Sequence, residues 1–155
     1  AEQLAAESSR TTHGAEECVD ACRLAARIMI RALRGEPKEA VLLGDAASYR
    51  GSASIEALAR GGFRGKDASA IRGSGYVVES LEAALWCFDR TSSFEAAVVL
   101  AAHLGDDADT TAAVCGQIAG AYYGLAAIPP HWLERLAMRD EITALADRLS
   151  KGLPA

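Results

Sequence analysis

The chain has 155 residues, of which 50% are hydrophobic but only 6% aromatic, so its apolar content is largely alanine and leucine. Both residues favour helices, and the composition predicts an all-α protein. The formal net charge of -5 argues against a nucleic-acid-binding surface, and the longest strictly apolar run, 96–102, is too short to span a bilayer. We expect residues 1–155 to form a single domain with neither nucleic-acid nor membrane partners.

The first strong helix signal covers about residues 14–34. Gly35 and Pro37 end it, and Thr11, Thr12 and His13 come just before it. Its predicted apolar face has five members at alternating spacings of four and three: Cys18, Cys22, Ala25, Met29 and Ala32. A histidine at a helix start is usually structural, so the residues alone leave a binding role for His13 open.

The four cysteines all fall on predicted apolar helix faces: Cys18, Cys22, Cys87 and Cys115. The first two are one helical turn apart, which is not a zinc-knuckle spacing. We therefore expect four buried, free thiols. Free thiols are typical of a reducing compartment, and we expect a cytoplasmic protein.

Short helices are expected at 39–43 and 54–59, the second inside a glycine-rich segment from Gly51 to Gly75. Long loops in compact domains tend to be functional. Gly73-Ser74-Gly75 precedes a helix signal at 77–88, where backbone N–H groups can face a phosphate. The third glycine of the dinucleotide-binding fingerprint is absent, and an ordinary turn is the alternative. Ser92 and Glu95 then predict a capping box for a helix ending at His103.

Three carboxylates fall within four residues after that helix: Asp106, Asp107 and Asp109. If the backbone turns at Ala108, the side chains of Asp107, Asp109 and Thr110 can converge on one point. Hard divalent cations prefer carboxylate and hydroxyl oxygens in such an arrangement. The alternative is helix capping, because aspartate is a good N-cap and its charge complements the helix dipole.

An apolar helix is predicted directly after the acidic residues, at about 110–126. We expect it to be the central, buried helix of a compact, irregular helical bundle. It carries Gly116, Gly120 and Gly124 on one face, where a neighbouring backbone can approach closely. Pro129 and Pro130 end it, and amphipathic helices at 131–136 and 139–149 are expected to close the bundle.

The segment from Gly105 to Thr111, continuing into 119–124, resembles the C-terminal metal motif of the ADP-ribosylglycohydrolase family. Three further stretches resemble the family in the expected order, at 8–13, 73–78 and 81–88, so the resemblance covers about residues 8–149. It implies hydrolysis of the N- or O-glycosidic bond between ADP-ribose and a protein side chain, with two divalent cations, Mg²⁺ or Mn²⁺. The implied metal ligands are Asp107, Asp109 and Thr110, and the implied substrate contacts are His13, Gly73, Gly75 and Tyr76.

A glutamate and a Thr-Asp-Asp cluster complete the metal site in the family's N-terminal region, and neither is found here. Asp45 and Asp67 stand alone in the sequence. The chain therefore resembles the C-terminal half of such an enzyme. We expect the missing N-terminal half, in cis or as a second chain, to supply the general acid/base, and ADP-ribosylated protein or ADP-ribose to be the partner. The alternative is a non-catalytic ADP-ribose- or nucleotide-binding, or structural, module of the same fold.

Overall fold

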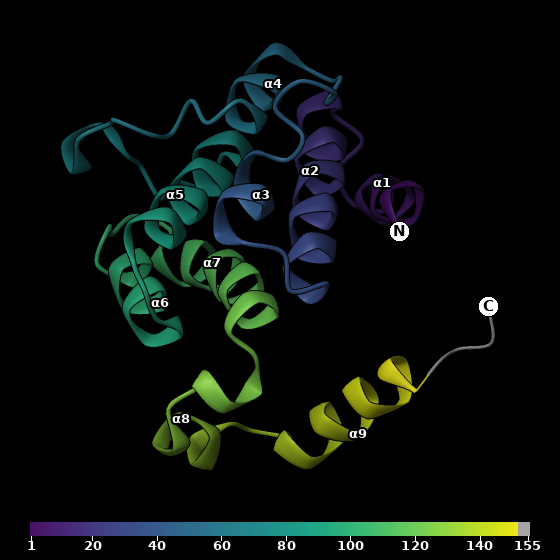
Figure 1. Ribbon diagram of the computed structural model, residues 1–155, viewed down its shortest axis with the longest axis vertical. Coiled ribbons are helices and arrows are strands. Elements are labelled where there is room, and N and C mark those ends of the chain that lie inside the picture. Colours follow the sequence, from purple (N-terminus) through teal and green to yellow (C-terminus); the bar gives the residue numbers. More distant parts are fainter. Residues whose placement is uncertain (152–155) are drawn as a thin grey trace.

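The computed structural model describes residues 1–151, and throughout that range the regular structure is helical (Figure 1). The all-α prediction is confirmed. In chain order the α-helices are α1 (Glu2–Arg10), α2 (Glu16–Leu33), α3 (Lys38–Leu43), α4 (Ala53–Ala59), α5 (Val77–Arg90), α6 (Phe94–Ala102), α7 (Ala108–Tyr123), α8 (Pro130–Arg135) and α9 (Arg139–Ser150). Short 3₁₀ turns lie at Ala68–Ala70 and Leu125–Ala127.

Helix α7 packs against α2, α5 and α6, as expected of a central helix (Figure 1). Its buried residues are Thr111, Cys115, Ile118 and Ala119. Gly116 and Gly120 face α6, where an added Cβ would lie 3.6 Å from Val98 and 3.7 Å from Phe94, an ordinary contact distance. The packing therefore does not demand glycine there. Gly124 has φ +80° and ends the helix earlier than residue 126.

Helices α5 and α6 complete the packing around α7. The buried residues of α5 run almost without interruption along its middle: Ser80, Leu81, Ala83, Ala84, Leu85, Trp86, Cys87 and Phe88. Helix α6 begins after Ser93, whose Oγ accepts a hydrogen bond from the Ala96 N–H at 3.1 Å. The predicted cap, Ser92, was wrong by one residue, because the chain stays extended through Ser93 before it turns.

Helix α2 buries a different face from the predicted one. Its buried residues are Val19, Asp20, Ala21, Leu24, Ile28 and Ala32. Of the predicted face only Ala32 is buried, and the other four residues are half-buried: Cys18, Cys22, Ala25 and Met29. The predicted burial of all four thiols is therefore right for Cys87 and Cys115 and wrong for Cys18 and Cys22, although all four are free.

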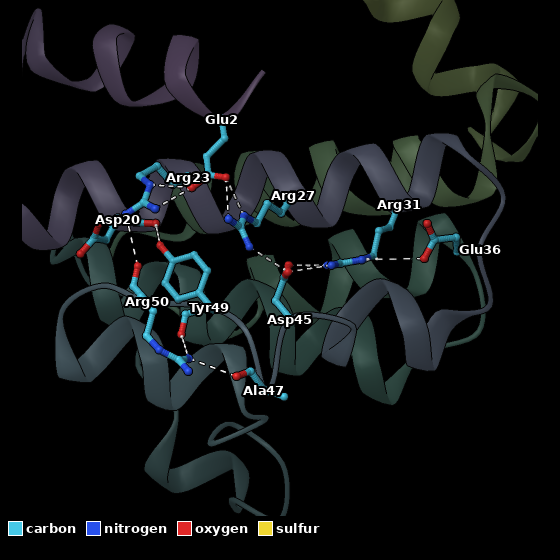
Figure 2. Close-up of polar contacts among 10 residues, drawn as sticks. All are labelled: Glu2, Asp20, Arg23, Arg27, Arg31, Glu36, Asp45, Ala47, Tyr49 and Arg50. Carbon is cyan, nitrogen blue, oxygen red and sulfur yellow. Dashed lines mark hydrogen bonds and ion pairs between the residues drawn. The ribbon is translucent and has the colours of Figure 1, made fainter.

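An ion-pair network joins α1, α2 and the loop after α3 (Figure 2). Glu2 bridges Arg23 and Arg27, with N···O distances of 2.6 and 2.7 Å. Asp45 is only 3% exposed and pairs with Arg27 at 3.0 Å and with Arg31. Hydrogen bonding to Arg31 holds the pKa of Asp45 below its usual value. The network holds α1 against α2, the two helices that the turn at 11–15 connects.

Helix α9 extends away from the packed helices (Figure 1), whereas Trp132 of α8 packs edge-on against Phe94 of α6, with ring centroids 6.0 Å apart. Both form where predicted, but none of the α9 residues is buried. Its apolar residues Ile142, Leu145 and Leu149 are exposed. The expectation that α9 closes the bundle was therefore wrong. Within residues 1–151, none of the helices combines the length and apolarity needed to cross a membrane.

Candidate functional site

The acidic residues lie in a tight turn between α6 and α7. Gly105 and Asp106 have φ of +80° and +52°, in the left-handed region that glycine adopts freely and aspartate tolerates. The turn places Asp107 at the N-cap position of α7. The Asp107 N–H donates to the Gly73 carbonyl at 2.7 Å, and the Asp107 carbonyl accepts from the Thr111 N–H at 3.0 Å. The acidic turn is thus tied to the loop before α5.

The carboxylates of Asp107 and Asp109 have no hydrogen-bond or ion-pair partner among the described residues. Asp107 stands at the N-cap, yet its side chain accepts no capping hydrogen bond. Within the described part of the chain, neither Asp107 nor Asp109 forms a side-chain hydrogen bond or an ion pair. Asp109 and Thr110 are exposed, and Asp107 is half-buried. Side-chain capping therefore does not explain why aspartate stands at 107, and the carboxylates remain open to another partner.

Gly73 and Gly75 bring the loop before α5 against the acidic turn. A Cβ on Gly73 would lie 2.9 Å from Thr111 Oγ1 and 3.3 Å from the Gly105 carbonyl oxygen, so only glycine fits there without a shift. At Gly75 the nearest atom to an added Cβ is Asp107 Oδ2, at 3.6 Å. Two segments that the sequence separates by about thirty residues therefore meet at Asp107.

A cavity of about 690 Å³ opens beside these loops. Four of the predicted site residues line it: His13, Gly75, Tyr76 and Thr110. Neither Asp107 nor Asp109 lines the cavity, although Asp107 Oδ2 lies near Gly75, which does. Gly73 is buried behind the loop. The structure therefore gathers predicted residues from the turn after α1, from the loop before α5 and from the start of α7.

His13 lies at the α1 side of the cavity and is held by its main chain. Its N–H donates to the Ser9 carbonyl at 2.7 Å, and its carbonyl accepts from Ser9 Oγ at 3.0 Å. Its ring Nδ1 lies 3.1 Å from Thr12 Oγ1, and the side chain is exposed. The position is fixed, while the Nε2 side of the ring has no protein partner among the described residues.

Sequence reasoning missed the part of the cavity formed by α2 and α5. Cys18, Cys22 and Ala25 line the cavity, as do Glu17 and Ser80. The regular spacing of the cysteines was visible, but a helical apolar stripe fits a core and a ligand cavity equally well. Ser80 is 6% exposed, and its Oγ has no hydrogen-bond partner. No sequence signal distinguished it from other serines.

The oxygen donors at the acidic turn are of the kind that hard divalent cations prefer. Two carboxylates and a hydroxyl, from Asp107, Asp109 and Thr110, are the oxygen ligands that Mg²⁺ and Mn²⁺ prefer. Within residues 1–151, no three His, Cys, Asp or Glu side chains are grouped so that they can hold a metal ion.

Comparison with known proteins gives consistent matches. The family model for ADP-ribosylglycohydrolase matches residues 1–154. The ADP-ribosylarginine hydrolase Tri1 of Pseudomonas putida (strain GB-1) is 42% identical over 146 residues, which are 94% of this chain and 39% of that protein. The ADP-ribosylhydrolase ARH3 of Homo sapiens is 32% identical over 84 residues, which are 47% of this chain and 23% of that protein.

A solved structure described as an ADP-ribosylglycohydrolase-related protein complex has a TM-score of 0.86 and 44% identity to this chain. The match covers 94% of this chain and 50% of that one. The chain thus spans 39% of the length of Tri1 and half of the solved chain. With the family model covering nearly every residue, the chain belongs to the ADP-ribosylglycohydrolase family.

Proposed function

We propose that this chain forms part of an enzyme that hydrolyses the bond between ADP-ribose and an arginine side chain of a protein. The relative named an ADP-ribosylarginine hydrolase matches 94% of the chain at 42% identity. The match to the ADP-ribosylhydrolase ARH3 covers less than half of the chain, at 32% identity. The more extensive similarity therefore favours an arginine acceptor, and with it an N-glycosidic bond.

The observation that carries this proposal is the cavity of about 690 Å³ between the turn after α1, α2, the loop before α5 and the start of α7. Its volume is within the range of about 300–1,000 Å³ that is typical of small-molecule sites. Apolar groups from α2 and α5 line its interior, and the polar side chains of His13, Tyr76 and Thr110 also face it. This combination suits a ligand such as ADP-ribose, which has a flat base and polar sugars.

In this proposal Asp107, Asp109 and Thr110 hold part of a site for two divalent cations, Mg²⁺ or Mn²⁺. When bound, such ions orient a substrate hydroxyl pair and a water molecule and stabilise the charge that develops as the glycosidic bond breaks. The contribution of this chain is two unpartnered carboxylates at the start of α7, where the hydrogen bond from Asp107 N–H to the Gly73 carbonyl fixes the turn. The remaining ligands and the general acid/base come from the rest of the protein.

The test uses the complete protein with Mg²⁺ or Mn²⁺ and two substrates that differ only in the ADP-ribosylated side chain, arginine or serine. We expect release of ADP-ribose from the arginine conjugate and a much lower rate with the serine conjugate. Asp109→Asn should abolish release, and Asp106→Asn, one residue before the two aligned ligands, should have the mildest effect. Release from the serine conjugate alone would contradict the arginine acceptor. No release from either conjugate would contradict the proposed hydrolase activity and favour a non-catalytic binding module.

A further inference from the structure

Tyr76 is an unusual cavity residue because it is large, aromatic and 48% exposed. It stands at the N-cap position of α5, directly after a loop with glycines at 73 and 75. An exposed tyrosine in a glycine-rich loop normally samples several rotamers. A ligand that packs against such a ring must first immobilise it, and this ordering weakens binding.

The backbone of this loop is already fixed. Gly73 is held against Thr111 and accepts the hydrogen bond from Asp107 N–H. Ser74 Oγ donates to the Glu79 carboxylate and accepts from the Tyr76 N–H at 3.2 Å. The freedom that remains at Tyr76 is therefore mainly rotation of its side chain.

Glu17, in the first turn of α2, is the hydrogen-bond partner of the Tyr76 side chain. The Tyr76 hydroxyl donates to Glu17 Oε2 at 2.5 Å, and Ser54 Oγ donates to Glu17 Oε1 at 2.5 Å. Hydrogen bonds to a carboxylate are stronger than those between neutral groups. These two bonds, the Ser54 bond first, hold the pKa of Glu17 below its usual value, and the bond to Glu17 raises the pKa of Tyr76.

Glu17 thus joins three segments that are remote in the sequence. It belongs to α2, Ser54 to the first turn of α4, and Tyr76 to the loop before α5. Both Glu17 and Tyr76 line the cavity. Because each Glu17 oxygen already accepts a hydrogen bond, its carboxylate is engaged in holding neighbouring groups.

We propose that Glu17 is a positioning residue that holds the Tyr76 ring at the cavity in the orientation that binds the ligand. The inference rests on the proposed function, because it takes ADP-ribose as the ligand. Glu17 needs no contact with the substrate in this role. Its effect is to supply the ordered ring before binding, so that binding does not have to order it.

The first measurement is ADP-ribose affinity by calorimetry on the complete protein with its divalent cation. We expect Glu17→Ala to weaken binding about three- to tenfold, which corresponds to freeing one side chain. Tyr76→Phe keeps the ring but removes the donor, so it should weaken binding equally. The double variant should be no worse than either single variant, because both remove the same contact.

Conservative and matched variants separate positioning from a general loss of structure. Glu17→Gln keeps an acceptor oxygen and should restore most of the affinity. Glu16→Ala removes the neighbouring glutamate, which is exposed and does not line the cavity, and should leave affinity unchanged. In turnover assays Glu17→Ala should raise KM and leave kcat within about twofold, as expected for a loss of uniform binding.

The outcomes distinguish this inference from the proposed function. A wild-type protein that does not bind ADP-ribose would overturn the proposed function and this inference with it. A wild-type protein that binds ADP-ribose, together with a Glu17→Ala variant that binds equally well, would overturn this inference alone. Additive losses in the double variant would also overturn it, since Glu17 and Tyr76 would then act separately.

Discussion

Two groups of acidic residues in this chain differ in whether their carboxylates have ion-pair partners. In the network of Figure 2, Glu2 pairs with Arg23 and Arg27, and Asp45 pairs with Arg27 and Arg31. At the start of α7, Asp107 and Asp109 have no such partner among the described residues. Each carboxylate in the first group stabilises contacts between segments, whereas those in the second group have no protein partner for their oxygens among the described residues.

The difference shows which acidic residues the fold uses. A buried carboxylate such as Asp45 is tolerated only when cations and hydrogen-bond donors surround it. The Asp107 side chain could serve the fold as a helix cap, yet it makes no capping hydrogen bond. We infer that the first group maintains the structure and that the second group serves the function, and this division can be tested.

The largest expected effect is on activity. In the complete protein, Asp107→Asn combined with Asp109→Asn should lower kcat by about a thousandfold or more, since loss of outer-shell partners alone costs about 10–100-fold. Asparagine caps helices about as well as aspartate, so the melting temperature should change little. Thr110→Ala should lower activity less, because a neutral oxygen contributes less than a carboxylate. Initial rates and thermal unfolding are measured on the same samples. A large loss of stability in the double variant would contradict the division between structural and functional carboxylates.

Asp45→Ala should have the opposite effect: a loss of stability with little change in activity. It leaves Arg27 and Arg31 without their buried partner, and we expect a loss of about 2–3 kcal/mol in the free energy of unfolding, below the value for fully buried pairs because both arginines are partly exposed. Glu36→Ala is the matched control, since Glu36 lies 3.8 Å from Arg31 and is partly exposed. It should cost less than about 0.5 kcal/mol. Urea unfolding measures the loss of stability in both variants. The activity per folded molecule should be unchanged in each.

Part of this division was predictable from the sequence and part was not. The density of acids at 106–109 and the apolar helix after them are local patterns, and they predicted α7, which begins directly after Asp107. Whether Asp107 and Thr110 bind a metal stays a prediction. Asp45 stands alone in the sequence, because Arg27 and Arg31 are brought to it only by the fold. The predicted apolar face of α2 was assigned to the core, because periodicity identifies an apolar face but not what packs against it. The same limit explains why α9 was expected to pack.

The thiols extend the comparison between core and cavity. Cys18 and Cys22 line the cavity and are half-buried, whereas burial raises the pKa of Cys87 and of Cys115 to about 12. We expect an alkylating reagent to modify the first two in the native protein and the other two only after unfolding. Saturating ADP-ribose should slow modification of Cys18 and Cys22 about tenfold. Mass spectrometry of the peptides measures the rate of modification at each cysteine. Equal rates with and without ADP-ribose would show that ADP-ribose does not occupy this cavity.

The smallest expected effect is a dependence of stability on pH. Because the Arg31 hydrogen bond lowers the folded-state pKa of Asp45, the unfolded chain binds a proton more readily than the folded chain. The stabilisation is present above the unfolded value, about 3.9, and is lost as the pH falls from there through the folded value. The free energy of unfolding should therefore fall more steeply below about pH 4 in the wild type than in Asp45→Asn. Identical pH profiles would show that Asp45 is not held charged by its arginines.

Metal binding tests the central claim most directly. Mn²⁺ is titrated into the complete protein, and bound ions are counted by electron paramagnetic resonance of the free ion. We predict two bound Mn²⁺ per wild-type chain, and the same number for folded Asp45→Ala. The Asp107→Asn, Asp109→Asn double variant should be folded but should bind Mn²⁺ far more weakly. Full Mn²⁺ occupancy in this double variant would contradict the assignment of these unpartnered carboxylates as metal ligands.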